Sequence, residues 1–284
     1  MFIRNQLEIL KTIKELKSKL ILIDGSLGFV PTMGALHKGH LSLLKSARKE
    51  NEILVASLFL NPKQFSPDED FHNYPRNIEK DISIFSDSGV DFVFMPDEDQ
   101  VYPKGFSTFI NNLEGGVFEG EFRDRHFEGV LTVVAKLINI VNPKRIYLGE
   151  KDAQQLFLIK KMLEDLNFDV IVRPVETIRE SNGLACSSRN SYFSRKEFVD
   201  AGNIYQSLLK VCTLWKEGEN DSSRLKQEFQ KNLEKLDDME IQYVEIVDPD
   251  TFKIINSLKN IKKSILIVAV IFKGIRLIDN IILD

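Results

Sequence analysis

Hydrophobic positions alternate between two patterns as far as about residue 177. Short, almost entirely apolar runs are typical of parallel strands that are covered on both faces. Between these runs, apolar residues recur every three or four positions, as in amphipathic helices. We predict strands at residues 27–30, 52–60, 91–95, 145–148 and 169–175, and helices at residues 5–20, 40–50, 78–88, 130–141 and 153–166. This alternation predicts an α/β fold with a Rossmann-like, doubly wound parallel sheet.

The pattern changes beyond this point. Two helical stretches, 196–215 and 222–236, precede strand-like runs at 241–247, 264–271 and 275–280. The dipeptide Lys273-Gly274 indicates a tight hairpin between the last two runs. Helices followed by strands predict a smaller α+β C-terminal domain. We therefore expect a first domain at residues 1–177 and a smaller C-terminal domain at residues 178–284.

Composition and charge narrow the class of protein. Of the 284 residues, 43% are hydrophobic and 28% are charged, which is typical of a globular protein. The net charge of −4 provides no global positive field to attract nucleic acid. The most apolar run, 265–272, is far shorter than the ~20 residues of a membrane-spanning helix, and the charged N-terminal region is unlike a signal peptide. Only two cysteines are present, as is typical of the reducing cytoplasm, so we expect a cytoplasmic protein. The net charge and the short apolar run lead us to expect neither nucleic-acid nor membrane partners.

The segment PTMGALHKGH carries the first candidate chemistry. It contains His37 and His40 and lies where the first sheet strand passes into a helix. Ligands of open α/β sheets bind at the carboxyl ends of the strands, and a helix N-terminus there attracts phosphate. The i, i+3 spacing directs both imidazoles to one face, and Gly34 and Gly39 permit close approach of a ligand. The pair is a candidate for holding a triphosphate; a zinc site is the alternative, although no third ligand follows at a suitable spacing.

Other polar segments are ambiguous by themselves. In GEKDAQQ, Lys151 is a cation suited to phosphate, and Asp152 is either a helix cap or an acceptor for a ribose hydroxyl. In SSRN, Ser187, Ser188 and Arg189 are candidates for a phosphate clamp, but a polar loop between domains explains them equally well. NPKQF alone indicates only a turn. Neither the Walker A pattern nor GxGxxG is present, so a nucleotide would bind without either glycine motif.

Together, these motifs resemble those of the pantoate–β-alanine ligase family. PTMGALHKGH, FLNPKQF, NYPR, HFEGV, GEKDAQQ, SSRN and RLIDN occur in the family's order and spacing over nearly the whole chain. HxGH alone marks a wide superfamily of nucleotidyltransferases and aminoacyl-tRNA synthetases, whereas NPKQF and GEKDAQQ narrow the assignment. The resemblance implies that ATP, carried with Mg²⁺, activates pantoate as an enzyme-bound pantoyl adenylate, which β-alanine converts to pantothenate. It also implies a homodimer without a tightly bound organic cofactor, in which residues 1–177 bind ATP and pantoate and residues 178–284 form a lid domain.

The resemblance assigns roles to individual residues. His40 is the expected catalytic acid, His37 contacts phosphate, and Lys151 faces charge that develops on the α-phosphate. Gln64 and Gln155 resemble the pantoate-binding pair. The other expected ATP-binding residues are Met33, Gly34, Ala35, Leu36, Lys38, Gly39, Gly149, Glu150, Asp152, Ile178, Cys186, Ser187, Ser188 and Arg189. No side chain is assigned as a metal ligand, since Lys80 stands where the family often has an acid before Asp81, near the position of its water-mediated Mg²⁺ contacts.

Two alternatives remain open. A nucleotidyltransferase acting on a phosphorylated acceptor would use HxGH equally well, but such an acceptor would more often meet Arg or Lys than Gln64 and Gln155. A nucleotide-binding module that has lost catalysis is the second alternative. Retention of four residues argues against it, namely His37, His40, Lys151 and Arg189.

Overall fold

The protein is described by a computed structural model that covers residues 7–67, 69–234 and 236–284. The chain forms two compact units. The first contains Met1–Glu150 and Leu158–Glu176, and the second contains Lys151–Phe157 and Thr177–Asp284. The domains that the sequence predicts, residues 1–177 and 178–284, stay a prediction.

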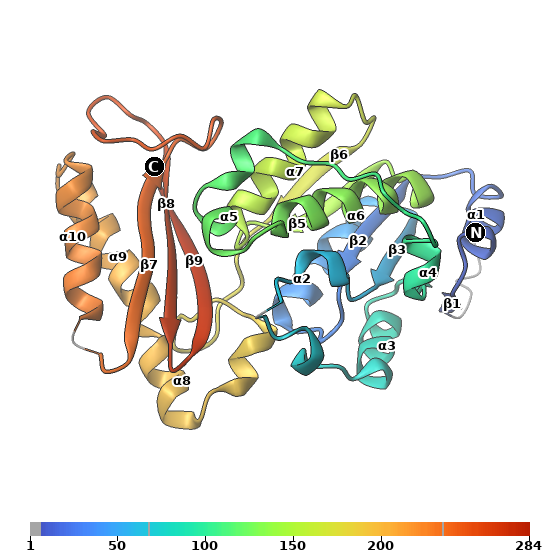
Figure 1. The fold of residues 1–284 in the computed structure, drawn as a ribbon, viewed down its shortest axis with the longest axis horizontal. Coiled ribbons are helices and arrows are strands. Elements are labelled where there is room, and N and C mark those ends of the chain that lie inside the picture. Colours follow the sequence, from blue (N-terminus) through green and yellow to red (C-terminus); the bar gives the residue numbers. More distant parts are fainter. Residues whose placement is uncertain (1–6, 68, 235) are drawn as a thin grey trace. The chain divides into compact units, whose positions relative to one another are not determined.

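The first unit is built on a six-stranded sheet (Figure 1). Its strands are β1 (Glu8–Leu10), β2 (Leu27–Thr32), β3 (Ile53–Leu58), β4 (Phe92–Phe94), β5 (Arg145–Gly149) and β6 (Ile171–Val175). They lie in the order β1-β4-β3-β2-β5-β6, and all pairs are parallel. From β2 the chain adds β3 and β4 on one side and later β5 and β6 on the other. The switch point, where open α/β sheets bind ligands, therefore lies between β2 and β5.

Helices and loops cover both faces of this sheet. The helices are α1 (Ile13–Leu20), α2 (Lys38–Glu50), α3 (Ile78–Asp87), α4 (Glu98–Val101), α5 (Glu119–Phe122), α6 (His126–Val141) and α7 (Ala153–Asp165). Val30 of β2 packs in one cluster with Leu44 of α2 and Phe85 of α3. Its neighbour Phe29, which points to the opposite face, is also fully buried. The predicted α/β class with a parallel sheet is thus confirmed.

The predicted helix over residues 5–20 is wrong at its start. Glu8–Leu10 forms β1 and pairs with β4, and residues 5 and 6 lie outside the described residues. The helix begins only at Ile13, after a capping box in which the Thr12 hydroxyl accepts from the Glu15 amide. Leu7 directly precedes this short strand and Leu10 ends it. Their three-residue spacing also fits a helical period, so periodicity alone did not distinguish the two structures.

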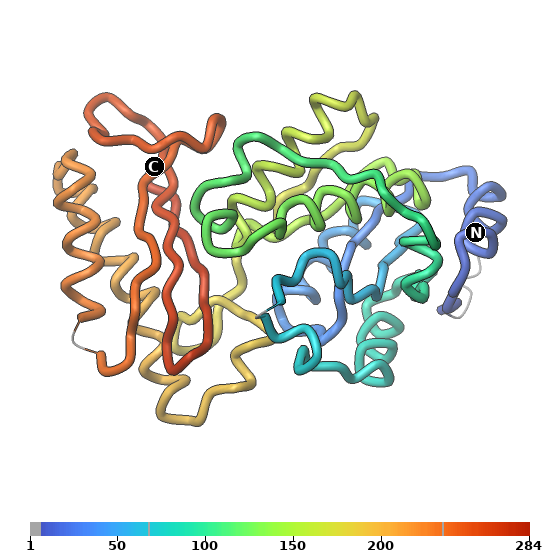
Figure 2. Tube along the Cα trace, in the orientation of Figure 1, coloured from blue at the N-terminus to red at the C-terminus, as the bar shows by residue number. Residues whose placement is uncertain are grey.

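The second unit places three helices before an antiparallel sheet, which Figure 2 traces as three adjacent lengths of chain. The elements are α8 (Arg195–Ala201), α9 (Asn203–Lys216), α10 (Ser222–Leu233), β7 (Met239–Val247), β8 (Ser264–Phe272) and β9 (Ile275–Leu283). The hairpin at Lys273-Gly274 is confirmed, since both residues have positive φ, 52° and 75°. The single helix predicted over 196–215 is wrong, because the chain breaks at Gly202. A Cβ there would lie 2.7 Å from the carbonyl oxygen of Asn182.

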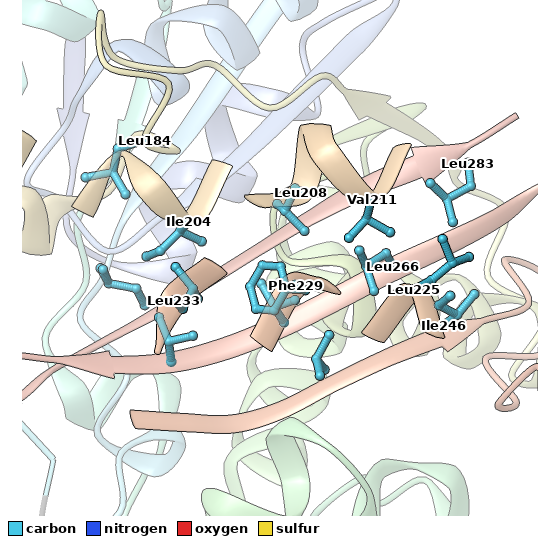
Figure 3. Packing of buried hydrophobic residues seen from close by; sticks show 14 of the residues in the cluster. Leu184, Ile204, Leu208, Val211, Leu225, Phe229, Leu233, Ile246, Leu266 and Leu283 are labelled. Carbon is cyan, nitrogen blue, oxygen red and sulfur yellow. The ribbon is translucent and has the colours of Figure 1, made fainter. Parts of the chain in front are cut away.

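The core of the second unit lies between the helices and the sheet. Figure 3 shows Leu208 and Val211 of α9 and Phe229 of α10 gathered with Leu266 of β8. All four are fully buried. Complete burial of such side chains is worth about 1.5–3 kcal/mol each, and Leu277 and Leu283 of β9 belong to the same cluster.

Candidate active site

The turn between β2 and α2 is held by a carboxylate from α3. The amides of Ala35 and Leu36 donate to the two oxygens of Asp81 at 2.9 and 2.8 Å. Gly34 has a φ of 88°, and a Cβ at this position would lie 3.0 Å from Asp81 Oδ2. Asp81 is only 2% exposed. Its carboxylate therefore fixes the backbone of the turn, a role that the sequence analysis missed because the two segments are far apart in the chain.

His37 and His40 cap the start of α2 reciprocally. His37 Nδ1 accepts from the Gly39 amide at 3.1 Å, and His40 Nδ1 accepts from the His37 amide at 3.3 Å. The ring centroids are 4.1 Å apart. Because each Nδ1 is an acceptor, the neutral rings carry their protons on Nε2, which makes Nε2 the donor of each ring. The structure thus brings the predicted histidine pair together at one helix N-terminus.

Gln64 lies beside the same turn. It ends the 3₁₀ turn Pro62–Gln64 that follows β3, and its Nε2 donates to Met33 Sδ at 3.0 Å. Its Oε1 accepts from Asn61 Nδ2 at 2.9 Å. The amide therefore has a fixed direction, with the oxygen toward Asn61 and the nitrogen toward the segment predicted to bind ATP.

Asn61 is a functional candidate that the sequence analysis treated only as part of a turn. It is 1% exposed, donates to the Gly129 carbonyl at 3.1 Å, and accepts from the Tyr102 hydroxyl at 2.8 Å. Burial raises the pKa of Tyr102 above its usual value, so the hydroxyl remains a donor at neutral pH. The available signal was its position directly after a predicted strand, next to Gln64.

The HFEGV motif contacts the backbone of the 3₁₀ turn Pro62–Gln64. A Cβ on Gly129 of α6 would lie 2.2 Å from the Lys63 carbonyl oxygen, so glycine is required for this close approach. His126 Nδ1 hydrogen-bonds the Gln64 carbonyl at 2.8 Å, and Arg123 hydrogen-bonds His126 Nε2 at the same distance. Since a carbonyl only accepts and a guanidinium only donates, His126 is neutral with its proton on Nδ1.

The GEKDAQQ segment begins at the switch point. Gly149 ends β5, the neighbour of β2, and the Glu150 amide donates to Val175 of β6 at 2.9 Å. Lys151, the next residue, and Gln155 belong to the second unit. There the Lys151 carbonyl accepts from the side chain of Asn280 at 2.9 Å.

The predicted clamp packs against the segment that contains Ile178. The Cys186 amide donates to the Ile178 carbonyl at 2.9 Å. The Ser187 hydroxyl accepts from the Arg189 amide at 3.3 Å and caps the 3₁₀ turn Ser188–Tyr192. The Cys186 thiol is buried and donates to Glu180 Oε1 at 3.3 Å. The structure therefore brings the predicted adenine and clamp positions together.

The predicted site residues fall into two groups. The first unit holds the turn at residues 33–40, Gln64, Gly149 and Glu150, and the second holds Lys151, Asp152, Gln155, Ile178 and residues 186–189. Within the described part of the chain, no three His, Cys, Asp or Glu side chains are grouped so that they could hold a metal ion. No helix there has the length and apolar character needed to cross a membrane.

Comparisons with curated proteins identify relatives along the whole chain. A pantothenate synthetase from Thermosipho melanesiensis is 44% identical over 280 residues, which cover 97% of this chain and 99% of that protein. One from Aquifex aeolicus is 47% identical over 257 residues, covering 89% and 90% of the two chains.

Solved structures have the same fold. A pantothenate synthetase from Thermus thermophilus is 40% identical with a TM-score of 0.91, covering 96% of this chain and 98% of that one. A pantoate-beta-alanine ligase from Francisella tularensis, described as complexed with beta-gamma ATP and beta-alanine, is 33% identical with a TM-score of 0.79 and covers 97% of each chain. A family model described as Pantoate-beta-alanine ligase matches residues 8–282. With this model spanning almost every residue and relatives this similar over their full length, the chain belongs to the pantoate-beta-alanine ligase family.

Proposed function

We propose that this protein condenses pantoate with β-alanine to pantothenate, using ATP and releasing AMP and pyrophosphate. The observation that carries the proposal is the joint arrangement of the His37–His40 cap and Gln64 around the turn after β2. Family membership supports it, as does the Francisella tularensis relative described with beta-gamma ATP and beta-alanine.

The first step activates the carboxylate of pantoate. A carboxylate oxygen attacks the α-phosphorus of ATP, a P–O bond forms, and the bond to the bridging oxygen of pyrophosphate breaks. In this proposal the Nε2 donors of His37 and His40 bind phosphate oxygens, and His40 stabilises the leaving pyrophosphate by donating a hydrogen bond without losing its proton. Such preorganised donors act by stabilising the transition state, and loss of one typically costs ~10²–10³ in turnover.

The second step uses the adenylate that the first step forms. The amine of β-alanine attacks the acyl carbon, a C–N bond forms, the C–O bond to AMP breaks, and the nitrogen loses a proton. Gln64 would orient pantoate through the second N–H of its Nε2, since the Asn61 contact fixes the direction of the amide and Met33 takes only one of its two donors. A neutral amide binds the substrate without forming an ion pair with the carboxylate oxygen that must attack.

We infer that Lys151 acts on the same polyphosphate as the two histidines. Its support is the connectivity of the sheet: β5 pairs with β2, and Lys151 is the second residue after β5. Ile178 and residues 186–189 would bind the adenosine part of ATP, and Gln155 would complete the pantoate site with Gln64.

Mg²⁺ enters this proposal with ATP as part of the substrate. Both oxygens of Asp81 accept backbone hydrogen bonds, so this carboxylate already has a structural role. A homodimer and a cytoplasmic location are further proposals, which rest on the family resemblance and on the low cysteine content.

One assay tests the proposed reaction against its alternatives. The protein is supplied with MgATP and pantoate, and pyrophosphate is measured before and after β-alanine is added. We expect pantoate-dependent pyrophosphate at once and AMP with pantothenate only after β-alanine. Pyrophosphate that forms only with a phosphorylated acceptor would indicate a nucleotidyltransferase, and ATP binding without turnover would indicate a binding module.

A further inference from the structure

The RLIDN motif on β9 has no role in the reaction described above, yet its last two residues are buried. Asp279 is 4% exposed and Asn280 is 8% exposed. Asn280 Nδ2 donates to the carbonyl oxygen of Lys151 at 2.9 Å, across 129 residues of sequence. A buried side-chain amide that donates a hydrogen bond to the backbone of a distant residue restrains the position of that residue.

Asp279 makes a second long-range connection. Its carboxylate accepts two hydrogen bonds from the guanidinium of Arg179, at 2.6 and 3.0 Å. Arg179 also donates to the carbonyl of Asn280 at 3.2 Å and stacks on the ring of Tyr205, 3.7 Å from its centroid. A planar guanidinium held by two parallel bonds and a ring has little freedom to turn.

This guanidinium belongs to the segment that the proposed function assigns to ATP. Arg179 follows Ile178, whose carbonyl accepts from the Cys186 amide, and it donates to the Gly183 carbonyl at 3.1 Å. The backbone N–H of Asn280 donates to Asp279 Oδ1 at 2.8 Å. This bond links the contact to Lys151 with the contact to Arg179. All of these residues, including Lys151, lie in the second unit.

We propose that Asp279 and Asn280 form a positioning pair that holds Lys151 and the Ile178 segment as one rigid body. Asn280 acts through Lys151 by fixing its backbone, so that the ammonium meets the α-phosphate without a search among chain conformations. The inference rests on the proposed function, which gives Lys151 and Ile178 their roles. A displacement of about 1 Å in such a group costs about 10²-fold in rate.

The test is a double-mutant cycle between Asn280 and Lys151. Asn280→Ala removes the donor and is compared with wild type, Lys151→Ala and the double variant, in single-turnover measurements of pantoate-dependent pyrophosphate release. We expect Asn280→Ala to lower this rate about 10- to 100-fold in the wild-type background and less than about 2-fold in the Lys151→Ala background. An interaction that acts through Lys151 has no effect once the ammonium is gone.

Two controls separate positioning from stability. Asn232→Ala removes an asparagine of α10 that donates to Glu228 in the same unit, and its rate should equal that of the wild type. Asn280→Ser, whose shorter side chain does not reach the Lys151 carbonyl, serves in case the alanine variant does not fold. Melting temperatures are recorded for all variants.

Equal losses in both backgrounds, or no loss at all, would overturn the inference while leaving the proposed function intact. A wild-type protein that releases no pyrophosphate with pantoate would overturn the proposed function, and the inference with it.

Discussion

At the scale of single residues, Asn61 and Gln64 show how a neutral amide acquires a direction. An isolated glutamine can present either its oxygen or its nitrogen to a ligand. Here Asn61 donates to Gln64 Oε1, while Tyr102 and Gly129 hold Asn61 in turn. The donor side of Gln64 therefore points away from Asn61 and toward Met33. This orientation agrees with a substrate that offers carboxylate and hydroxyl oxygens.

The charge of Gln64 gives the first prediction. Gln64→Glu introduces a carboxylate of similar shape, which would repel the carboxylate of pantoate. Repulsion between like charges costs several kcal/mol, so we expect kcat/KM for pantoate to fall by about 100-fold or more.

The matched control for this variant is Gln227→Glu on the exposed face of α10, which should leave the kinetics unchanged. Steady-state kinetics with varied pantoate decide the question. Unaltered pantoate kinetics in Gln64→Glu would remove Gln64 from the substrate site.

Gly129 gives the second prediction. Gly129→Ala would place a methyl carbon only 2.2 Å from the Lys63 carbonyl oxygen and would push the Pro62–Gln64 turn away from α6. Overpacking of this kind typically costs about 1–3 kcal/mol of stability. We expect a lower midpoint in urea denaturation together with a raised KM for pantoate. A variant with wild-type stability would show that the two segments do not approach as described.

At the scale of elements, the periodicity of the sequence predicted most strands and helices, but not every boundary. The strand predicted at 27–30 continues through Pro31 to Thr32, and the helix predicted from 130 begins at His126. Local periodicity does not detect β1, which pairs with β4, or the break at Gly202, where the backbone approaches Asn182 closely. Both features arise from long-range contacts that a sequence window does not contain.

The support of α2 by α3 gives the third prediction. Asp81→Ala removes both acceptors that hold the Ala35 and Leu36 amides. Hydrogen bonds to a charged group contribute about 1.5–3 kcal/mol each, so we expect a marked loss of stability. We also expect kcat/KM for ATP to fall about 10- to 100-fold, because the turn before His37 would lose its shape.

Asp87→Ala, at an exposed position on the same helix, is the control and should behave as wild type. Asp81→Asn keeps one acceptor oxygen and should recover part of the loss. The three variants are compared by urea denaturation and by ATP-dependent kinetics. An Asp81→Ala variant with normal ATP kinetics would contradict the role given to this carboxylate.

At the scale of the whole molecule, the motif residues are divided between two compact units. The sequence located the motifs because their residue types and spacing are local. It did not locate the supporting contacts of Asn61, Asp81 and Asn280, because each of these joins segments that are far apart in the chain. The chemical groups of the site were therefore predictable from the sequence. The contacts that hold these groups in place became visible only in the folded structure.

The central claim is that His37, His40 and Lys151 act on one polyphosphate. The most direct test of this claim is a crystal structure of the protein with pantoate and α,β-methylene-ATP. This analogue is not cleaved between its α- and β-phosphorus atoms. We predict His37 Nε2, His40 Nε2 and Lys151 Nζ within about 3.2 Å of phosphate oxygens of the same nucleotide. A nucleotide bound by the histidines while Lys151 points elsewhere, or one bound away from the turn after β2, would contradict the account.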